Sequence, residues 1–287
     1  MAAIKPPTTY KQQIEKLRSR GCIIQDEDHA IDILSKVNYY RLTAYFLPFK
    51  KHDETYINGT DFGIIFQIYE FDRKMRLIIF SAIEEIEVNL RSILAYYHAH
   101  KYGALGYLDN KNYSPKHKHI EFISRIEEEK KKRLKEPFVQ HHIDKYGGSF
   151  PIWVMIELFT FGTLSHFYTD MPLNDQKSIA RHFFKTHQKT LSSWLKCCTD
   201  LRNFCAHFGR LYYRIFTSIP DGIPELDKYN QRSLYAVIMV LKNLYTDPIK
   251  WNKEIFTSLY SLINEYKANI QLSCIGFPAD WETKLKR

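Results

Sequence analysis

Glycine and proline are scarce in this chain, with 11 of each among 287 residues. A turn-rich all-β protein needs more of both, so the sequence predicts helices rather than sheets. The longest uncharged stretch, residues 158–169, is far shorter than the roughly 20 apolar residues of a membrane-spanning helix. The opening residues also have no apolar core of the kind found in signal peptides. We therefore expect neither a membrane protein nor a secreted one.

Recurrent metal and cofactor motifs are also missing. The sequence contains no C-x2-C pair, no H-E-x-x-H, no glycine-rich phosphate loop and no G-x-S-x-G. We therefore predict no metal and no cofactor. An odd number of scattered thiols fits a reducing cytoplasm better than a disulfide framework. The five cysteines are Cys22, Cys197, Cys198, Cys205 and Cys274.

Aromatic residues and positive charge are what the chain has in excess. Hydrophobic residues make up 45% and aromatic residues 15%, with 20 tyrosines and 19 phenylalanines, which is typical of a compact globular protein. The formal net charge is +9. This excess favours a polyanionic partner such as RNA, although many basic proteins bind nothing acidic.

The apolar spacing predicts helices along almost the whole chain. We expect one domain over residues 1–287, with an N-terminal helical part at about 1–146 and a second part at about 150–287, separated by Gly147-Gly148. Residues 115–146 are polar and densely charged, which favours a solvated helical surface over a nucleic-acid arm. The other predicted helical segments are 9–21, 26–37, 38–49, 62–100, 151–168, 174–184, 190–213, 230–246 and 249–269.

The segment RNFCAH, residues 202–207, is the feature that points most directly to chemistry. On a helix, Asn203 and His207 share a face, so the amide can orient the imidazole, and Arg202 is within reach of both. A guanidinium holds anionic phosphate oxygens and an imidazole moves a proton near neutral pH, which suits chemistry on a phosphodiester. The alternative is that these residues form an ordinary surface face or a buried hydrogen-bonded cluster.

The residues around this motif add to the first interpretation. Helical spacing of apolar residues gives the segment a core face, and downstream cations beside two tyrosines suit a nucleic-acid backbone. We predict that Arg210 and Arg214 bind RNA. The apolar positions are Leu201, Phe204, Cys205, Phe208 and Leu211.

A second group of polar residues lies in the first half. Glu87 precedes Arg91 at i,i+4 spacing, and Arg91 and His98 form an R-x6-H pattern. An internal ion pair beside an aromatic cluster is the favoured interpretation. The functional alternative is that Glu87 and Arg91 support the 202–207 motif from a facing helix.

The chain resembles the Abi-like (abortive infection) family, a branch of the HEPN superfamily of helical ribonucleases. The resemblance rests on KVNYYRLTAYFLPF, on FQIYEFDRKMRLIIFSAIEEIEVNLRSILAYYHAHKYG, on WLKCCTDLRNFCAHFGRLYYR and on IGFPADW. It implies an all-α fold, a HEPN-like helical bundle with additional N-terminal and C-terminal helices. It also implies Arg202, Asn203 and His207 as the catalytic set, a homodimer, and a relation to the nuclease modules of type VI CRISPR effectors.

The expected activity is metal-independent cleavage of RNA through attack by the 2′-hydroxyl, in phage defence by abortive infection. His207 would transfer the proton, Arg202 would stabilise charge and Asn203 would orient the ring. One alternative is a non-catalytic RNA-binding or scaffold protein. Another is a toxin that stays silent until a protein, an antitoxin partner or a guide or regulatory RNA engages it.

Overall fold

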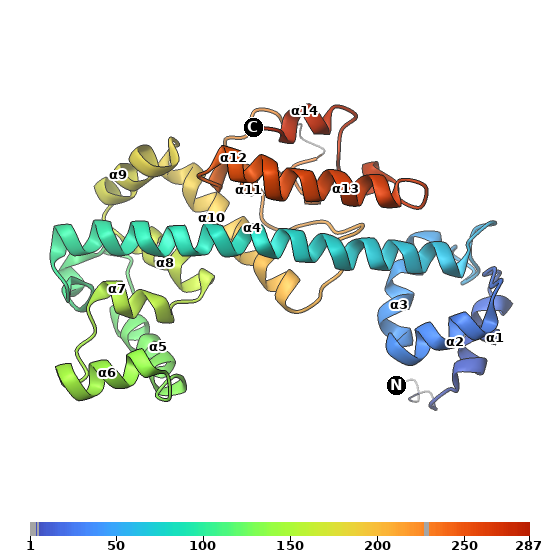
Figure 1. Ribbon diagram of the computed structural model, residues 1–287, viewed down its shortest axis with the longest axis horizontal. Coiled ribbons are helices and arrows are strands. Elements are labelled where there is room, and N and C mark those ends of the chain that lie inside the picture. Colours follow the sequence, from blue (N-terminus) through green and yellow to red (C-terminus); the bar gives the residue numbers. More distant parts are fainter. Residues whose placement is uncertain (1–3, 5, 227–229) are drawn as a thin grey trace.

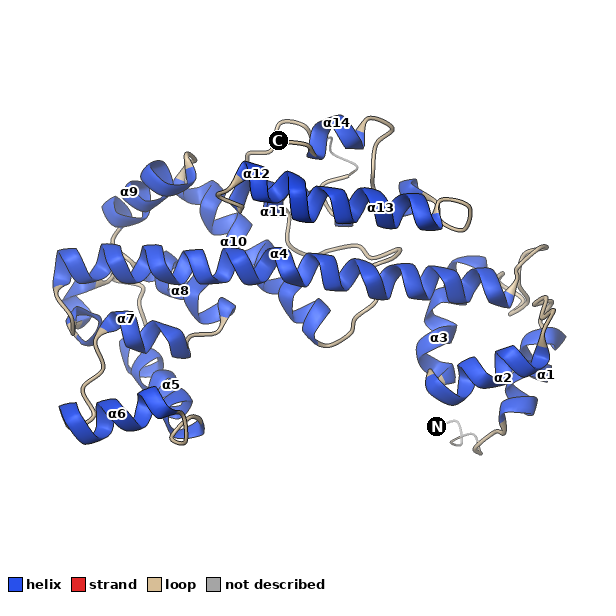
Figure 2. Ribbon diagram, viewed as in Figure 1, coloured by secondary structure: helices blue, strands red, loops and turns tan. Residues whose placement is uncertain are grey.

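The computed structural model describes residue 4 and residues 6–226 and 230–287, and these residues form an all-α protein. Figure 2 shows helices and connecting loops, with no strand in the described part of the chain. The all-α prediction is therefore confirmed. No helix among these residues is long and apolar enough to cross a membrane.

One long helix, α4 (Phe62–Tyr102), runs the length of the molecule (Figure 1). The Asp61 side chain caps it by accepting a hydrogen bond from the backbone N–H of Ile64, and Gly103, with φ 82°, ends it. Its 41 residues span about 60 Å at 1.5 Å per residue. Helices from both halves of the chain pack along it, so α4 is the common wall of the core.

The N-terminal helices gather at one end of α4, on the right in Figure 1. They are α1 (Tyr10–Ser19), α2 (Glu27–Lys36) and α3 (Tyr39–Phe46). Thr9 forms a capping box with Gln12, and Asp26 caps α2, as their positions in the sequence predict. A short 3-10 turn (Leu47–Phe49) follows α3 and leads into the loop before α4.

The opposite end of α4 carries a group of shorter helices. They are α5 (His119–Lys132), α6 (Pro137–Tyr146), α7 (Ile152–Met155) and α8 (Phe161–Asp170), with 3-10 turns at Gly106–Leu108, Asn110–Asn112 and Ile156–Leu158. On α5, ion pairs join Glu127 to Lys130, which is partly buried, and Glu129 to Lys132, which is exposed. These pairs fit the solvated surface that the charge pattern favours.

The remaining helices pack along α4 from its C-terminal end, where the first of them lies, toward its middle. They are α9 (Leu173–Phe184), α10 (Gln188–Ala206), α11 (Leu234–Leu244), α12 (Pro248–Lys250), a π-helical segment (Trp251–Phe256), α13 (Thr257–Tyr266), a 3-10 turn (Leu272–Ile275) and α14 (Trp281–Leu285). Both α10 and α13 contact α4 directly, and Figure 1 shows α13 lying along it. The last helix packs through buried Trp281 and Leu285, and its Leu285 carbonyl accepts a bond from Trp251 Nε1.

Candidate functional site

The motif of residues 202–207 lies at the C-terminal end of α10. The helix ends at Ala206, and His207 is its C-cap. The expected helical spacing through Leu211 is therefore wrong beyond this point. Phe208 takes a left-handed conformation with φ 55°, and the N–H groups of Phe208 and Gly209 bond back to the carbonyls of Cys205 and Phe204. This is a Schellman ending built on a phenylalanine rather than the usual glycine.

Gly209 is required by the close approach that this ending creates. A Cβ at Gly209 would lie 2.7 Å from Cδ1 of Phe204 and 3.1 Å from its carbonyl oxygen. The chain therefore turns away sharply after His207 instead of continuing as helix. As a result, the imidazole stands at an exposed corner.

Arg202, Asn203 and His207 lie in the last turn and at the C-cap of α10, and no hydrogen bond or ion pair is recorded between their side chains and another described residue. No described residue makes a hydrogen bond or ion pair with the guanidinium of Arg202, and its Nε atom is buried. Asn203 and His207 are exposed, and the hydrogen bond recorded between them joins the backbone N–H of His207 to the carbonyl of Asn203 at 3.0 Å. Orientation of the ring by the amide stays a prediction. A half-buried arginine without a protein partner is available to an anionic ligand.

The thiol inside the motif is not a candidate nucleophile. Cys205 is 5% exposed, and burial raises the pKa of its thiol to about 12. The groups left to do chemistry here are the exposed imidazole and amide and the half-buried guanidinium.

A buried carboxylate on α4 fixes the turn that follows the motif. Asp72 is 1% exposed and accepts hydrogen bonds from the backbone N–H groups of Leu211 (3.1 Å) and Tyr212 (2.8 Å), and from the Tyr45 hydroxyl (2.6 Å). Its ion pair with Arg76 spans 2.6 Å, and Arg76 also donates to the Gly209 carbonyl at 3.1 Å.

This pair is the part of the site that the sequence reasoning missed. Burial raises the pKa of the Asp72 carboxyl, while the Arg76 guanidinium and the neighbouring donors oppose that rise. One feature of the sequence could have predicted this ion pair. Asp72 and Arg76 are spaced i,i+4 on the apolar face of α4, where an unpaired charge would be costly. That spacing indicates an ion pair, but not which backbone amides it binds.

A groove of about 760 Å³ opens beside the motif, between α3, α4 and the end of α10. Arg41 lines this groove and donates a hydrogen bond to the Phe208 carbonyl at 2.7 Å. The lining combines positive charge with exposed apolar surface, since Leu77 is 61% and Phe208 65% exposed. The lining residues are Lys36, Val37, Asn38, Arg41, Tyr69, Arg73, Arg76, Leu77, Phe80, Cys205, Ala206 and Phe208.

Arg210 and Arg214, predicted to bind RNA, are both half-buried and in contact with the protein. Arg210 donates to the Ala44 carbonyl and lies 5.9 Å from the centre of the Tyr45 ring. Arg214 lies 3.9 Å from the ring centre of Phe204, and its Nε is buried without a hydrogen-bond partner. These contacts hold the segment after the motif against α3 and α10. Binding of RNA by either arginine stays a prediction.

Glu87 and Arg91 form the predicted ion pair, at 2.5 Å. Arg91 also donates to the Phe159 carbonyl at 2.7 Å and lies 3.9 Å from a carboxylate oxygen of Glu157. Fifteen residues of helix, about 22 Å, separate Arg91 from Arg76, which holds the motif's turn. None of the recorded partners of Arg91 is a motif residue, so its support of the site stays a prediction.

His98, the second half of the R-x6-H pattern, is fully buried. It packs against the rings of Tyr102, Tyr113 and Phe167, and neither ring nitrogen has a hydrogen-bond partner. Burial lowers the pKa of His98 to about 4, so the ring is neutral at physiological pH. In the described part of the chain, no three His, Cys, Asp or Glu side chains gather as a metal site would require.

The chain belongs to the family of Abi-like proteins, whose sequence model matches residues 32–213. The match begins in α2 and ends just beyond the motif, so it includes Asp72, Arg76 and the 202–207 segment. No curated protein and no solved structure matches the chain.

Proposed function

We propose that this protein is an endoribonuclease of the HEPN type, which cleaves RNA without a metal ion. The observation that carries the proposal is the pairing of an exposed imidazole, His207, with an arginine whose guanidinium has no partner among the described residues. Both residues lie at the end of α10, and their neighbours Cys205, Ala206 and Phe208, but not Arg202 or His207 themselves, line the groove described above. The buried Asp72–Arg76 pair anchors the turn that follows.

The residue types support a reaction in which RNA supplies its own nucleophile. The ribose 2′-hydroxyl attacks the neighbouring phosphorus, and the bond from phosphorus to the 5′-oxygen of the next nucleotide breaks. His207 transfers a proton, and Arg202 stabilises the charge that builds on the phosphoryl oxygens. Asn203 orients the imidazole. The products are a 2′,3′-cyclic phosphate and a 5′-hydroxyl, and DNA is not cleaved because it lacks the 2′-hydroxyl.

The groove supplies a path for the RNA strand next to the motif. Lys36, Arg41 and Arg73 lie along it. Lys36 pairs with Asp32 and Arg73 with Glu70 at the surface, and in this proposal RNA phosphates replace these exposed carboxylate partners. Tyr69 and Phe80 suit stacking with unpaired bases. Arg210 and Arg214, in the segment after the motif, add further positive charge. We expect binding to weaken as salt concentration rises.

The active species in this proposal is a homodimer in which two copies of the motif face one RNA. One imidazole cannot serve as base and acid at the same instant, so a second copy supplies the other. Exposed Leu77 and Phe208 beside the motif give a second copy an apolar surface to cover. Light scattering at micromolar protein should give twice the monomer mass.

Membership in the Abi-like family supports a role in phage defence by abortive infection. In that role, cleavage of cellular RNA halts the infected cell before phage is released. A protein that stays silent until an antitoxin or RNA releases it would show the same site but no cleavage when purified alone. A non-catalytic RNA-binding scaffold would bind RNA and never cleave it.

The decisive experiment incubates purified protein with labelled single-stranded RNA in excess EDTA. We expect products ending in 2′,3′-cyclic phosphate, no cleavage of a substrate with 2′-deoxyribose at the cut site, and loss of cleavage in His207→Ala. His182→Ala, an exposed histidine on α9, is the matched control and should cleave normally. Strict dependence on added magnesium, or equal cleavage by His207→Ala, would refute the proposal.

A further inference from the structure

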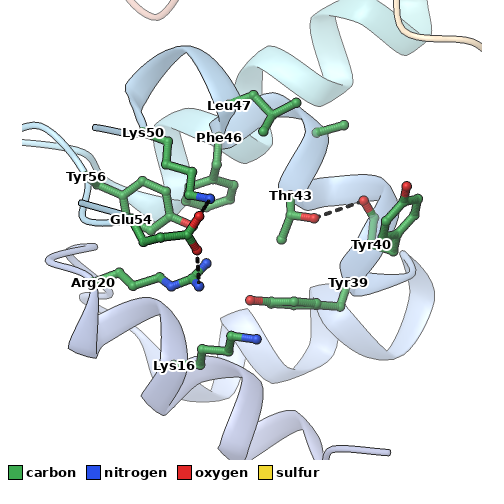
Figure 3. Close-up of a pocket in the computed structure, with 11 residues that line it drawn as sticks. Lys16, Arg20, Tyr39, Tyr40, Thr43, Phe46, Leu47, Lys50, Glu54 and Tyr56 are labelled. Carbon is green, nitrogen blue, oxygen red and sulfur yellow. Dashed lines mark hydrogen bonds and ion pairs between the residues drawn. The ribbon is translucent and has the colours of Figure 1, made fainter. Parts of the chain in front are cut away.

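A separate pocket lies among the N-terminal helices and the loop that follows α3. It has a volume of about 380 Å³ and opens beside α1 and α3 (Figure 3). Tyr40 lines this pocket, whereas the next residue, Arg41, lines the groove beside the motif. The two openings therefore share α3 as a common wall. The proposed reaction uses no residue of this pocket.

The loop before α4 builds one side of the pocket by folding back on α1. A β-bridge joins Lys50 to Tyr56, and the Tyr56 N–H donates to the Arg20 carbonyl at 2.7 Å. Between these ends, Glu54 takes a left-handed backbone conformation with φ 72°. A glutamate rarely adopts this conformation, and here the loop that carries it points the Glu54 carboxylate into the pocket, toward Arg20 and Lys50.

Three cations converge on this space against one lining carboxylate. Glu54 pairs with Arg20 at 2.7 Å and with Lys50, and Figure 3 shows both contacts. The amine of Lys16 has no partner among the described residues. The lining therefore keeps two positive charges in excess, close to the charge of about −1.5 to −2 on a phosphate monoester.

Three tyrosines line the pocket as well, beside Thr43, Ala44, Phe46 and Leu47. The Tyr39 ring lies over the pocket with its hydroxyl directed toward Arg20 in Figure 3, and Tyr56 is 4% exposed behind Glu54. Burial raises the pKa of both tyrosines, so their hydroxyls stay protonated and can donate to an anion. Tyr40 is 86% exposed at the rim, where a flat aromatic group could stack on it.

We propose that this pocket binds a nucleotide, with its phosphate held by Lys16, Arg20 and Lys50 and its base stacked on tyrosine at the rim. An arginine and two lysines around one point suit the several oxygens of a phosphate, and 380 Å³ lies in the range of small-ligand pockets. The same chemistry is presented by a free mononucleotide and by one nucleotide of an RNA strand.

Removing the negative charge of Glu54 should strengthen nucleotide binding rather than weaken it. The Glu54 carboxylate already neutralises Arg20 and Lys50, so an incoming phosphate competes with it. Glu54→Gln removes that competition while keeping the side chain's shape, and we expect it to tighten nucleotide binding about three- to tenfold. Lys16→Glu places a negative charge at the unpartnered cation and should weaken binding at least about tenfold.

The experiment measures binding by calorimetry on the full chain carrying His207→Ala, so that RNA stays intact. Because the readout is binding, it is independent of whether the ribonuclease proposal holds. The probes are a nucleoside 5′-monophosphate, the same nucleoside without phosphate, inorganic phosphate, and a short single-stranded RNA. Lys11→Glu is the matched control, because Lys11 is an exposed lysine on α1 outside the pocket lining.

We expect the monophosphate to bind more tightly than either the nucleoside or inorganic phosphate, since only it presents both parts. Binding should weaken in Lys16→Glu, tighten in Glu54→Gln and stay unchanged in Lys11→Glu. If the natural ligand is part of a strand, the RNA binds more tightly than the monophosphate and loses affinity in Lys16→Glu. The proposal is overturned if no phosphate-bearing probe binds at millimolar concentration, or if Lys16→Glu and Lys11→Glu behave alike.

Discussion

Two arginine–histidine pairs of similar spacing occupy opposite environments in this molecule. His207 stands exposed where α10 ends, whereas His98 is fully buried in the middle of an aromatic cluster. Arg202 has no recorded partner in the described part of the chain, whereas Arg91 is engaged by Glu87, Glu157 and the Phe159 carbonyl. The residue types are the same in both pairs, so chemistry depends on what surrounds them.

The difference teaches how a reactive pair can be separated from a structural one. A guanidinium already satisfied by carboxylates and a carbonyl has little to offer a phosphate, and a ring without access to solvent cannot exchange protons with a substrate. Among the described residues, the side chains of Arg202 and His207 have no recorded hydrogen-bond partner, while Asp72 and Arg76 hold the backbone of the turn that follows, at Gly209, Leu211 and Tyr212. Unused side chains on a fixed backbone are what preorganised catalysis requires.

The largest contrast should appear in RNA cleavage. His207→Ala should lower the rate by about 10²–10⁴-fold, because in the proposed mechanism this imidazole transfers the proton. Arg202→Ala should give a loss of at least about a hundredfold through lost charge stabilisation. Single-turnover rates on labelled RNA provide the measurement. Thermal unfolding of both variants, followed by circular dichroism, should match that of the unmodified protein. If a variant unfolds, its loss of cleavage does not support a difference in role between His207 and His98.

The second-largest effect should come from Asp72, which holds the turn after the motif, and it should appear in the stability of the protein. Asp72→Ala should destabilise the protein by about 3–5 kcal/mol, because it leaves the Arg76 charge and two backbone amides buried without their acceptor. Urea titration measures the loss. Asp32→Ala is the control, since it breaks an exposed i,i+4 pair with Lys36 and should cost less than about 0.5 kcal/mol. Equal losses in the two variants would mean that Asp72 does not anchor the turn.

Much of the helical framework could be predicted from sequence, because its signals are local. Asp26 is the cap that its position predicts, and the open choices between Thr8 and Thr9 and between Thr60 and Asp61 resolve to Thr9 and Asp61. The uninterrupted apolar spacing after residue 62 predicted α4 nearly to its end at Tyr102.

The site was harder to predict, because its geometry depends on contacts between distant residues. The end of α10 requires Phe208 in a left-handed conformation that phenylalanine seldom adopts, so its apolar side chain suggested a longer helix. Asp72 binds the amides of Leu211 and Tyr212, which lie about 140 residues further along the chain. No periodicity in the sequence relates these positions. The motif's residue types were recognisable, whereas the anchor beneath it was not.

Substitution of Arg91 tests whether the Arg91–His98 pair contributes to the activity of the 202–207 motif. Arg91→Ala should cost about 1–3 kcal/mol of stability, because it breaks the half-buried pair with Glu87 and leaves the Phe159 carbonyl without a donor. Cleavage measured at a temperature where the variant is folded should fall less than in Arg202→Ala. Complete loss of cleavage in a folded Arg91→Ala protein would instead make Arg91 part of the catalytic set. Arg73→Ala, which breaks an exposed pair with Glu70, is the stability control.

The smallest expected effect is on how strongly the stability of the folded protein depends on pH, to which His98 contributes. Burial lowers the pKa of this ring from 6.5 to about 4, so between these values the unfolded chain binds a proton that the folded protein does not. Stability is therefore lost as pH falls from about 6.5 toward 4, by at most about 3.4 kcal/mol from this residue. The rings of Tyr102, Tyr113 and Phe167 face it, and the Asp175 charge opposes the shift.

His98→Phe should remove this contribution while keeping an aromatic ring of similar size in the cluster. Stability at pH 7.5 should stay equal or rise by up to about 2 kcal/mol, because two buried ring nitrogens without partners are eliminated. Urea titrations at several pH values should then show a shallower loss of stability between pH 6.5 and 4 than in the unmodified protein. RNA cleavage at neutral pH should change less than about threefold. The opposite result would be an unchanged loss of stability between pH 6.5 and 4 together with a large loss of cleavage in His98→Phe. That result would make His98 a functional group, like His207, and not a structural one.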